Sequence, residues 1–337
     1  MNNSSFTHPQ TFSKQFQIGT SMFTVLMIVA TIFGNSLVIA AFVTFVRLRT
    51  ATNYFVVSLA ATDLCVALFS MPIYVAYLVT GPSWKLGYIL KRVWTIMDVL
   101  SGTASIANLV AISLDRCMCI DKPLMYYQYI TSVRVQTTIA IIWLYSIAMS
   151  ITSYFMWEYR IFNFVASIMY FWVPLLIIIS AYSVVFRVAL HQVRRISIAS
   201  NIEQSFRKSL NSKYSFVREF KAAKTLAVVV GAFIVCWLPF VIINAIYTFC
   251  ENDSCPPINV KHILITKWMH YGNSMLNPPI YGFMNKDFRV AFKHLLCCKQ
   301  IAYRGEQFTE NANGKARISP QVIEMENENR ISGSNKA

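Results

Sequence analysis

Charged residues are scarce in this chain. Only 13% of its 337 residues are charged, whereas 55% are hydrophobic. Soluble domains carry about 25% charged residues, so this composition excludes an ordinary soluble domain. Histidine is scarcer still: the five His residues are scattered, and no nucleophile–base set or metal cluster supports an enzyme. We also find neither internal repeats nor interrupted helices, which argues against a transporter or channel.

Long apolar runs are what the chain has instead. Helices of about 20 residues cross a bilayer, and Pro and Gly inside several runs favour membrane helices over soluble core helices. Seven stretches are long enough: 18–46, 53–79, 89–119, 134–156, 163–189, 220–249 and 261–284. The predicted fold is an all-α membrane protein, a bundle of seven transmembrane helices.

The placement of basic residues predicts the orientation in the membrane. The first 20 residues hold one basic residue, Lys14, whereas 187–224 hold nine basic residues against two acidic ones. The positive-inside rule therefore places the N-terminus outside and, after seven spans, the C-terminus inside. We expect an extracellular segment at 1–17 without a cleavable signal peptide, a membrane domain at 18–300, and a disordered cytoplasmic tail at 301–337. Between two spans, the basic tract predicts contact with anionic lipid or an acidic partner rather than nucleic acid.

Several short motifs predict modifications outside the membrane. Overlapping Asn-X-Ser sequons at Asn2 and Asn3 predict glycosylation of the N-terminus. Cys250 and Cys255 fall in one expected outside loop, "CENDSC", where the oxidising compartment permits a short-loop disulfide. On the inner side, "RRIS" matches a kinase site at Ser197.

An eighth, amphipathic helix is expected after the seventh span. In "NKDFRVAFKHLLCC", Phe288, Phe292 and Leu295 recur at helical spacing, with Lys and Arg on the other face. This pattern is typical of a helix lying on the membrane surface. Cys297 and Cys298 at its end are candidate palmitoylation sites.

Five polar residues recur inside the expected spans. Asp63 lies in the second span, Ser105 in the third, and Asn273, Ser274 and Asn277 in the seventh. A buried carboxylate among amides and hydroxyls suits a small hard cation. The residues alone equally allow a hydrogen-bonded cluster that only locks the helices together.

Two further acids lie toward opposite ends of the third span. Asp98 has no basic residue within a helical turn of it along the chain, and a carboxylate at membrane depth needs a partner. We therefore expect that partner to arrive from outside the chain. Asp115 follows 17 residues later, about 25 Å along the helix, beside Arg116. Glu219 at the start of the sixth span is within reach of Arg116 as an interhelical latch.

Taken in order, these motifs resemble the rhodopsin-like (class A) G-protein-coupled receptors from about residue 18 to 300. The matches are Asn35 in "GNSLVI", Asp63 in "LAATDL", "DRC" at 115–117, Trp143, Pro174 with Tyr182, "FIVCWLPF" at 233–240 and "NPPIY" at 277–281. The resemblance implies a multi-pass receptor of the plasma membrane that activates heterotrimeric G proteins, with receptor kinases and arrestin as further partners.

The resemblance also implies roles for particular residues. Arg116 would insert toward the G-protein α-subunit when the sixth helix swings out, with Tyr182 and Tyr281 stabilising that open state. Ile106, Pro174 and Phe233 match the packing relay beneath the ligand pocket, and Trp237 matches its aromatic switch. The cluster of Asp63, Ser105, Asn273, Ser274 and Asn277 matches the family's allosteric sodium site. No other cofactor is expected.

The ligand expected from this resemblance is a protonated amine. Asp98 stands where biogenic amine receptors present a counter-ion, and Tyr271 and Trp268 in "WMHYGNS" match the same pattern. Trp237 and Phe240 supply aromatic faces that suit a cationic headgroup. Ser167 takes a position where catecholamine receptors place serines, and Asn244 stands where adenosine receptors hold a purine.

Some departures leave other ligands open. Lys91 stands where most of the family has a stapling cysteine, and the second outside loop, about 156–163, is short and contains no cysteine. Both features resemble the melanocortin, lysophospholipid, cannabinoid and adenosine receptor group. The alternatives are a receptor for an adenosine-like, lipid or peptide ligand and an orphan receptor whose basal activity is altered by its Asp-Arg-Cys motif. An opsin would need lysine at Tyr271, and Lys267 lies one turn outward from it.

Overall fold

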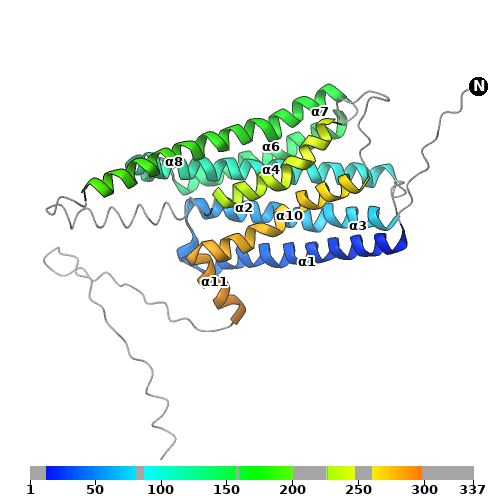
Figure 1. The fold of residues 1–337 in the computed structure, drawn as a ribbon, viewed down its shortest axis with the longest axis horizontal. Helices are drawn as coiled ribbons and strands as arrows, with labels where there is room; N and C mark the ends of the chain where they lie inside the picture. Colours follow the sequence, from blue (N-terminus) through cyan, green and yellow to red (C-terminus); the bar gives the residue numbers. More distant parts are fainter. Residues whose placement is uncertain are drawn as a thin grey trace, which may run out of the picture. The chain divides into compact units, whose positions relative to one another are not determined.

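A computed structural model describes residues 13–80, 87–156, 159–199, 225, 227–246 and 260–297, and in this part of the chain every regular element is helical (Figure 1). The elements in chain order are α1 (Lys14–Thr44), η1 (Val46–Leu48), α2 (Ala51–Cys65), η2 (Val66–Ser70), α3 (Met71–Thr80), α4 (Tyr88–Asp121), α5 (Pro123–Tyr129), α6 (Ser132–Met156), α7 (Arg160–Ser167), η3 (Ile168–Trp172), α8 (Val173–Ala199), the helix Ala227–Ile246, α10 (Val260–Met284) and α11 (Lys286–Cys297). The prediction of an all-α membrane fold is confirmed.

Six helical segments in the described part are long and apolar enough to cross a membrane. Two of the spans run through more than one element: α2, η2 and α3 form one, and α7, η3 and α8 form the other. The expected seventh span corresponds to α10, a helix of 25 residues that is not among these six. It carries polar side chains that are buried within the bundle, among them Lys267, His270 and Asn273.

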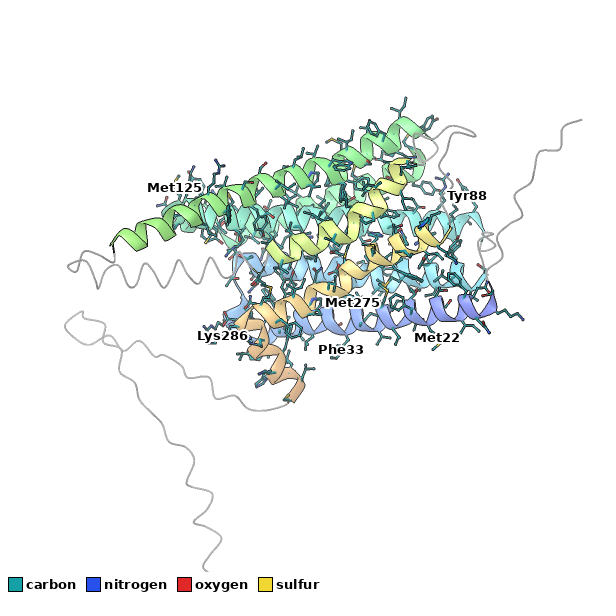
Figure 2. The ribbon with its side chains drawn as sticks, in the orientation of Figure 1. Met22, Phe33, Tyr88, Met125, Met275 and Lys286 are labelled. Carbon is teal, nitrogen blue, oxygen red and sulfur yellow. The ribbon has the colours of Figure 1, made fainter. Side chains whose placement is uncertain are left out.

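α4 lies among the other helices and packs against α2, α6 and α8, while α1 packs against α2 and α10. The largest core cluster joins Ile106 and Leu109 of α4 to Phe171 and Phe233. Large apolar side chains also cover the outside. Along α1, Met22 and Phe33 point away from the bundle (Figure 2), where a membrane helix meets lipid.

α1 and α10 approach each other closely at Gly34. A Cβ atom added to Gly34 would lie 2.9 Å from Cγ of Pro278, so only glycine leaves room for the proline ring. Beside it, Asn35 Nδ2 donates to the Ser274 carbonyl oxygen at 3.0 Å. Small residues and interhelical hydrogen bonds are what hold helices together in lipid, where the hydrophobic effect between them is absent.

Two π-helical turns interrupt the second and fifth spans at a similar depth. η2 ends at Ser70, and η3 contains Tyr170. A π turn adds a residue to one helical turn and so rotates the side chains that follow it. These turns direct Ser70 and Tyr170 toward the polar interior described below.

α11 forms where the sequence predicts an amphipathic eighth helix. Its apolar face packs against the bundle: Phe288 is fully buried and stacks on Tyr281 at 5.6 Å, and Phe292 and Leu295 pack against the same core cluster. The phenylalanines therefore anchor α11 to α10 rather than only to lipid. Contact of its other face with a membrane surface stays a prediction.

Several predicted modification and latch residues lie outside the described residues. These are Asn2, Asn3, Glu219, Cys250, Cys255 and Cys298. Ser197 falls in the last turns of α8, which extends to Ala199, beyond the expected end of the fifth span at residue 189. Cys297 carries a free, exposed thiol at the end of α11. Residues 298–337 form a separate unit that is likewise outside the described residues.

Candidate functional site

A cavity of about 450 Å³ opens between α3, α4, η3, the helix Ala227–Ile246 and α10. This volume is in the range of small-molecule sites. Its wall is largely aromatic with few charged groups, and it is lined by Tyr74, Tyr77, Lys91, Trp94, Thr95, Asp98, Val99, Gly102, Thr103, Tyr170, Trp237, Phe240, Asn244, Ile263, Leu264, Lys267 and His270.

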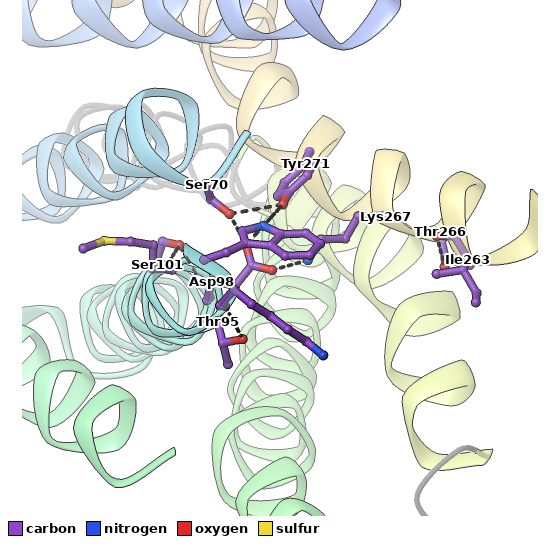
Figure 3. A network of polar contacts seen from close by, with 11 residues as sticks. Ser70, Thr95, Asp98, Ser101, Ile263, Thr266, Lys267 and Tyr271 are labelled. Carbon is purple, nitrogen blue, oxygen red and sulfur yellow. Dashed lines mark hydrogen bonds and ion pairs between the residues drawn. The ribbon is translucent and has the colours of Figure 1, made fainter. Parts of the chain in front are cut away.

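Asp98 is held by groups from two other spans (Figure 3). Ser70 from η2 donates to Oδ1, and the Tyr271 hydroxyl donates to the same oxygen at 3.3 Å. Trp94 Nε1 in turn donates to the Tyr271 hydroxyl at 2.9 Å, which fixes that ring. The support from Tyr271 predicted by the sequence is present, and Ser70 and Trp94 add to it.

The carboxylate of Asp98 does have a partner within the chain, which corrects the sequence-based expectation. Lys267 Nζ donates to Asp98 Oδ2 as a buried ion pair, with the two side chains 7% and 18% exposed. The expectation failed because Lys267 is distant in sequence yet lies on α10 directly across from α4. Burial makes each charge depend on the other, since neither can be solvated alone.

Aromatic rings surround the Lys267 ammonium. Nζ lies 4.8 Å from the ring centre of Phe240, 4.9 Å from that of Tyr271 and 5.2 Å from that of Trp94. Each distance is within the range of a cation–π contact. The site thus holds an ammonium group with one carboxylate and three aromatic faces, a combination suited to a protonated amine.

A column of aromatic rings continues inward from the cavity. Trp237 stacks on Phe233 at 5.2 Å and on Phe171 at 6.4 Å, and it meets His270 edge-on at 4.1 Å. Gly102 permits this position, because a Cβ there would lie 2.5 Å from Cη2 of Trp237. Any movement of the Trp237 ring is therefore transmitted to the packed side chains beneath it.

The predicted ligand residues divide into three groups. Asp98, Trp237, Phe240 and Asn244 line the cavity, and Tyr271 supports it from behind. The other two, Trp268 and Ser167, do not line the cavity.

Trp268 and Ser167 lie away from the cavity for physical reasons. Trp268 turns toward α1, where its Nε1 donates to Thr24 Oγ1 at 3.1 Å and its ring meets Phe23. Ser167 is buried just before η3 and is not part of the cavity wall. The π turn brings Tyr170 to the cavity instead.

Sequence reasoning missed several lining residues, above all Lys267 and His270. A usable signal was present: Lys267 precedes Tyr271 by four residues, and side chains at that spacing share one helix face. Because Tyr271 was already predicted to bond Asp98, Lys267 one turn outward could have been inferred as a second neighbour of the same carboxylate. Tyr74 and Tyr77 lie on α3 and Trp94 lies on α4, and no local sequence motif marks these residues as part of the cavity.

The predicted sodium-site residues are all buried, in α2, α4 and α10. Asn277 Nδ2 donates to Asp63 Oδ2 at 2.8 Å, and Ser105 Oγ lies 3.2 Å from Thr62 Oγ1. The Ser274 backbone oxygen accepts from Asn35, as described above. Asp63 Oδ1 and Asn273 Oδ1 are buried without a hydrogen bond from the described residues. Among these residues, no group of three His, Cys, Asp or Glu side chains could hold a metal ion.

A second buried ion pair lies at the other end of α4. Arg116 pairs with Asp115 at 2.7 Å, Thr52 of α2 donates to Asp115 Oδ2 at 2.6 Å, and Tyr126 of α5 donates to Oδ1 at 2.9 Å. Burial and the nearby Asp115 charge raise the pKa of the Tyr126 hydroxyl, which keeps it protonated as a donor. Thr52 and Tyr126 were not predicted, and Glu219 lies outside the described residues.

The other residues matched to activation roles lie between the two ion pairs. Ile106 and Phe233 are buried in one core cluster, and Pro174 begins α8 beneath the π turn η3. Tyr182 packs partly buried against the same cluster, and Tyr281 is buried within it. Trp143 Nε1 donates to Ser58 Oγ at 3.2 Å and ties α6 to α2.

Arg92 ties the N-terminal end of α4 to α6. Its guanidinium lies 4.8 Å from the Tyr88 ring centre and 5.4 Å from that of Tyr154, and its Nη1 donates to the Tyr154 carbonyl oxygen at 2.8 Å. These contacts lie next to Lys91, the position where the related pattern has a stapling cysteine. A non-covalent clamp occupies this end of α4.

The described helices thus form an apolar bundle with an aromatic-lined cavity around Asp98 and a buried arginine, Arg116, toward the other end of α4. The family model for "7 transmembrane receptor (rhodopsin family)" matches residues 34–281, and the chain belongs to that family. It is a G-protein-coupled receptor and a multi-pass membrane protein rather than an enzyme.

Individual relatives are similar over most of their length. The chain is 33% identical to the Histamine H2 receptor of Rattus norvegicus over 320 residues, covering 89% of this chain and 86% of that protein. It is 34% identical to the Probable G-protein coupled receptor No18 of Amphibalanus amphitrite, covering 81% and 88%. It is also 34% identical to the D(1A) dopamine receptor of Didelphis virginiana, covering 85% and 75%.

Proposed function

We propose that this receptor binds a small extracellular amine through Asp98 and activates a heterotrimeric G protein at the Arg116 end of the bundle. The observation that carries the proposal is the ammonium site itself. Asp98 lies in an aromatic cavity and already accepts the ammonium of Lys267, held among Trp94, Phe240 and Tyr271. A ligand amine that takes this place meets the same carboxylate and the same rings.

The relatives support an amine over the other ligand classes. Their names include histamine and dopamine receptors, and none of the three described above is named for adenosine, a lipid or a peptide. The orientation proposed with this function places residues 1–17 outside the cell at the plasma membrane. Receptor kinases and arrestin are proposed as partners of the inner face.

Asp98→Asn is expected to weaken activation by amines by at least about thirtyfold, because truncating one member of a desolvated charge pair costs about 2 kcal/mol or more. The measurement is G-protein activation in cells across a panel of amines that includes histamine and dopamine. Asp287→Asn serves as the matched control, since Asp287 is exposed at the opposite end and pairs only at the surface with Arg47. Undiminished amine responses in Asp98→Asn would rule out the amine proposal.

We further propose that Na⁺ binds at Asp63 as an allosteric ion. The buried oxygens of Asp63 and Asn273 that lack hydrogen bonds support it, because Na⁺ is a hard cation that oxygen ligands suit. The ion would hold α2, α4 and α10 in their packed arrangement and so oppose activation.

In isolated membranes, replacing NaCl by KCl is expected to raise amine potency by about fivefold or more in the wild type, the lower range of allosteric coupling. Asp63→Asn is expected to remove this sodium dependence. Asp98→Asn should retain the direction of the effect on any residual response. Equal sodium dependence in wild type and Asp63→Asn would contradict the proposed site.

A further inference from the structure

Lys267 stands where the proposed function places the ligand's amine. Its Nζ bonds Asp98 Oδ2 (Figure 3). The rings of Trp94, Phe240 and Tyr271 enclose the same ammonium. A ligand amine must therefore displace the Lys267 ammonium from the carboxylate. The side chain of Lys267 is 7% exposed, so the displaced ammonium has little water to enter.

The charges that line the cavity make displacement of the Lys267 ammonium less favourable still. The acidic and basic side chains of the wall are Asp98, Lys91, Lys267 and His270, and its tyrosines are neutral, so the wall carries a net positive charge even with His270 neutral. A ligand with only a positive charge adds to that excess and leaves Lys267 as an uncompensated buried cation. Removing one partner from a buried pair is strongly unfavourable, whereas supplying a replacement partner is not.

We propose that the ligand is a zwitterion of the amino-acid class, whose ammonium binds Asp98 and whose carboxylate binds Lys267. The inference rests on the amine function proposed above and narrows it to one ligand chemistry. An α-amino acid carries both charged groups on one carbon, which fits an Asp98–Lys267 pair whose charged atoms are in contact. Each protein charge then exchanges one partner for another, and none is left alone.

Other parts of the wall agree with this ligand class. Lys91 lies seven residues before Asp98 on α4, about 10 Å toward the outer end, where its charge attracts an entering carboxylate. Tyr74, Tyr77 and Trp237 provide aromatic surface for the ligand's own side chain. The volume of about 450 Å³ leaves room for an aromatic amino acid.

The test compares ligands that differ only in their charged groups. The probes are the standard amino acids with their decarboxylated amines, and two complete triples: histidine, histamine and imidazole propionate, and tyrosine, tyramine and hydroxyphenylpropionate. G-protein activation is measured for the wild type, Lys267→Met and Lys267→Arg, with surface expression followed in parallel. Lys261→Met is the matched control, because Lys261 lies on the same helix, is exposed and does not line the cavity.

The wild type is expected to respond to an amino acid at concentrations at least about thirtyfold below those of its decarboxylated amine. Lys267→Met should reverse that order, since the carboxylate loses its partner while the amine gains a free Asp98. Lys267→Arg should preserve the wild-type order, as should Lys261→Met. If Lys267→Met does not reach the cell surface, the order of potencies of amino acids and amines in the wild type and in Lys267→Arg tests the inference.

Two outcomes overturn the inference. A wild type that prefers the amines, with responses lost in Asp98→Asn, refutes the zwitterion and leaves the amine proposal standing. A wild type that responds to no amino acid in the panel refutes it too. Responses that are unchanged in both Asp98→Asn and Lys267→Met would refute the amine proposal together with this inference.

Discussion

Lys267→Met is expected to destabilise the ligand-free receptor by about 3 kcal/mol or more, because it leaves the Asp98 carboxylate buried without its cation. Ser70 and Tyr271 continue to donate to Asp98 Oδ1, but Oδ2 loses the group that bonds it. Asp98→Asn is expected to destabilise the receptor for the converse reason, since it strands the Lys267 ammonium among aromatic rings. The measurement is thermal unfolding of the purified receptor in detergent.

The double variant Asp98→Asn/Lys267→Met is the decisive member of this set. It removes both charges together, and an amide at position 98 keeps the hydrogen bonds from Ser70 and Tyr271. We expect it to be more stable than either single variant, which is the non-additivity that contacting residues show. Lys261→Met, on the exposed side of α10, should melt close to the wild type. Losses that simply add in the double variant would show that the two side chains do not act as a pair.

Arg116→Met is expected to abolish G-protein activation while leaving ligand binding largely intact. The variant also leaves Asp115 buried with only Thr52 and Tyr126, so a stability loss of about 3 kcal/mol or more is expected. Radioligand or fluorescent-ligand binding and G-protein activation, measured on the same membranes, separate the two effects.

A companion variant tests whether Arg116 does more than balance a buried charge. Asp115→Asn/Arg116→Met removes both charges and should recover stability but not signalling, because the guanidinium proposed to contact the G protein is still missing. Arg47→Met is a control at the same end, since Arg47 is exposed and pairs with Asp287 at the surface. Recovery of signalling in the double variant would show that Arg116 has only a structural role.

The fold could be predicted from the sequence because its signals are local. The length of each apolar run, the basic residues between runs and motifs such as "NPPIY" each depend on neighbouring residues alone. The same holds for Trp237 and Phe240, which sit in one helical motif and both line the cavity. The helix α11 was likewise visible in the spacing of Phe288 and Phe292.

The pairing of Asp98 with Lys267 could not be predicted in the same way. It depends on how far α4 and α10 slide and rotate against each other, and a shift of one residue on either helix would separate the two groups. The position of Ser167 outside the cavity wall could not be predicted for a related reason. The π turn η3 changes the direction of side chains, and no sequence motif marks that turn. Trp268 lies one residue from Lys267, yet that step of about 100° turns it toward α1.

In the orientation proposed above, the clamp at Arg92 faces the outside of the cell. The chain has no cysteine between Cys65 and Cys117, so this end of α4 cannot be joined to a loop by a disulfide. Its attachment to α6 through Arg92 and Tyr154 does not depend on thiols or oxidants, and it responds instead to salt and to competition by other cations. At this end of α4, reducing surroundings leave the attachment intact and ionic surroundings tune it.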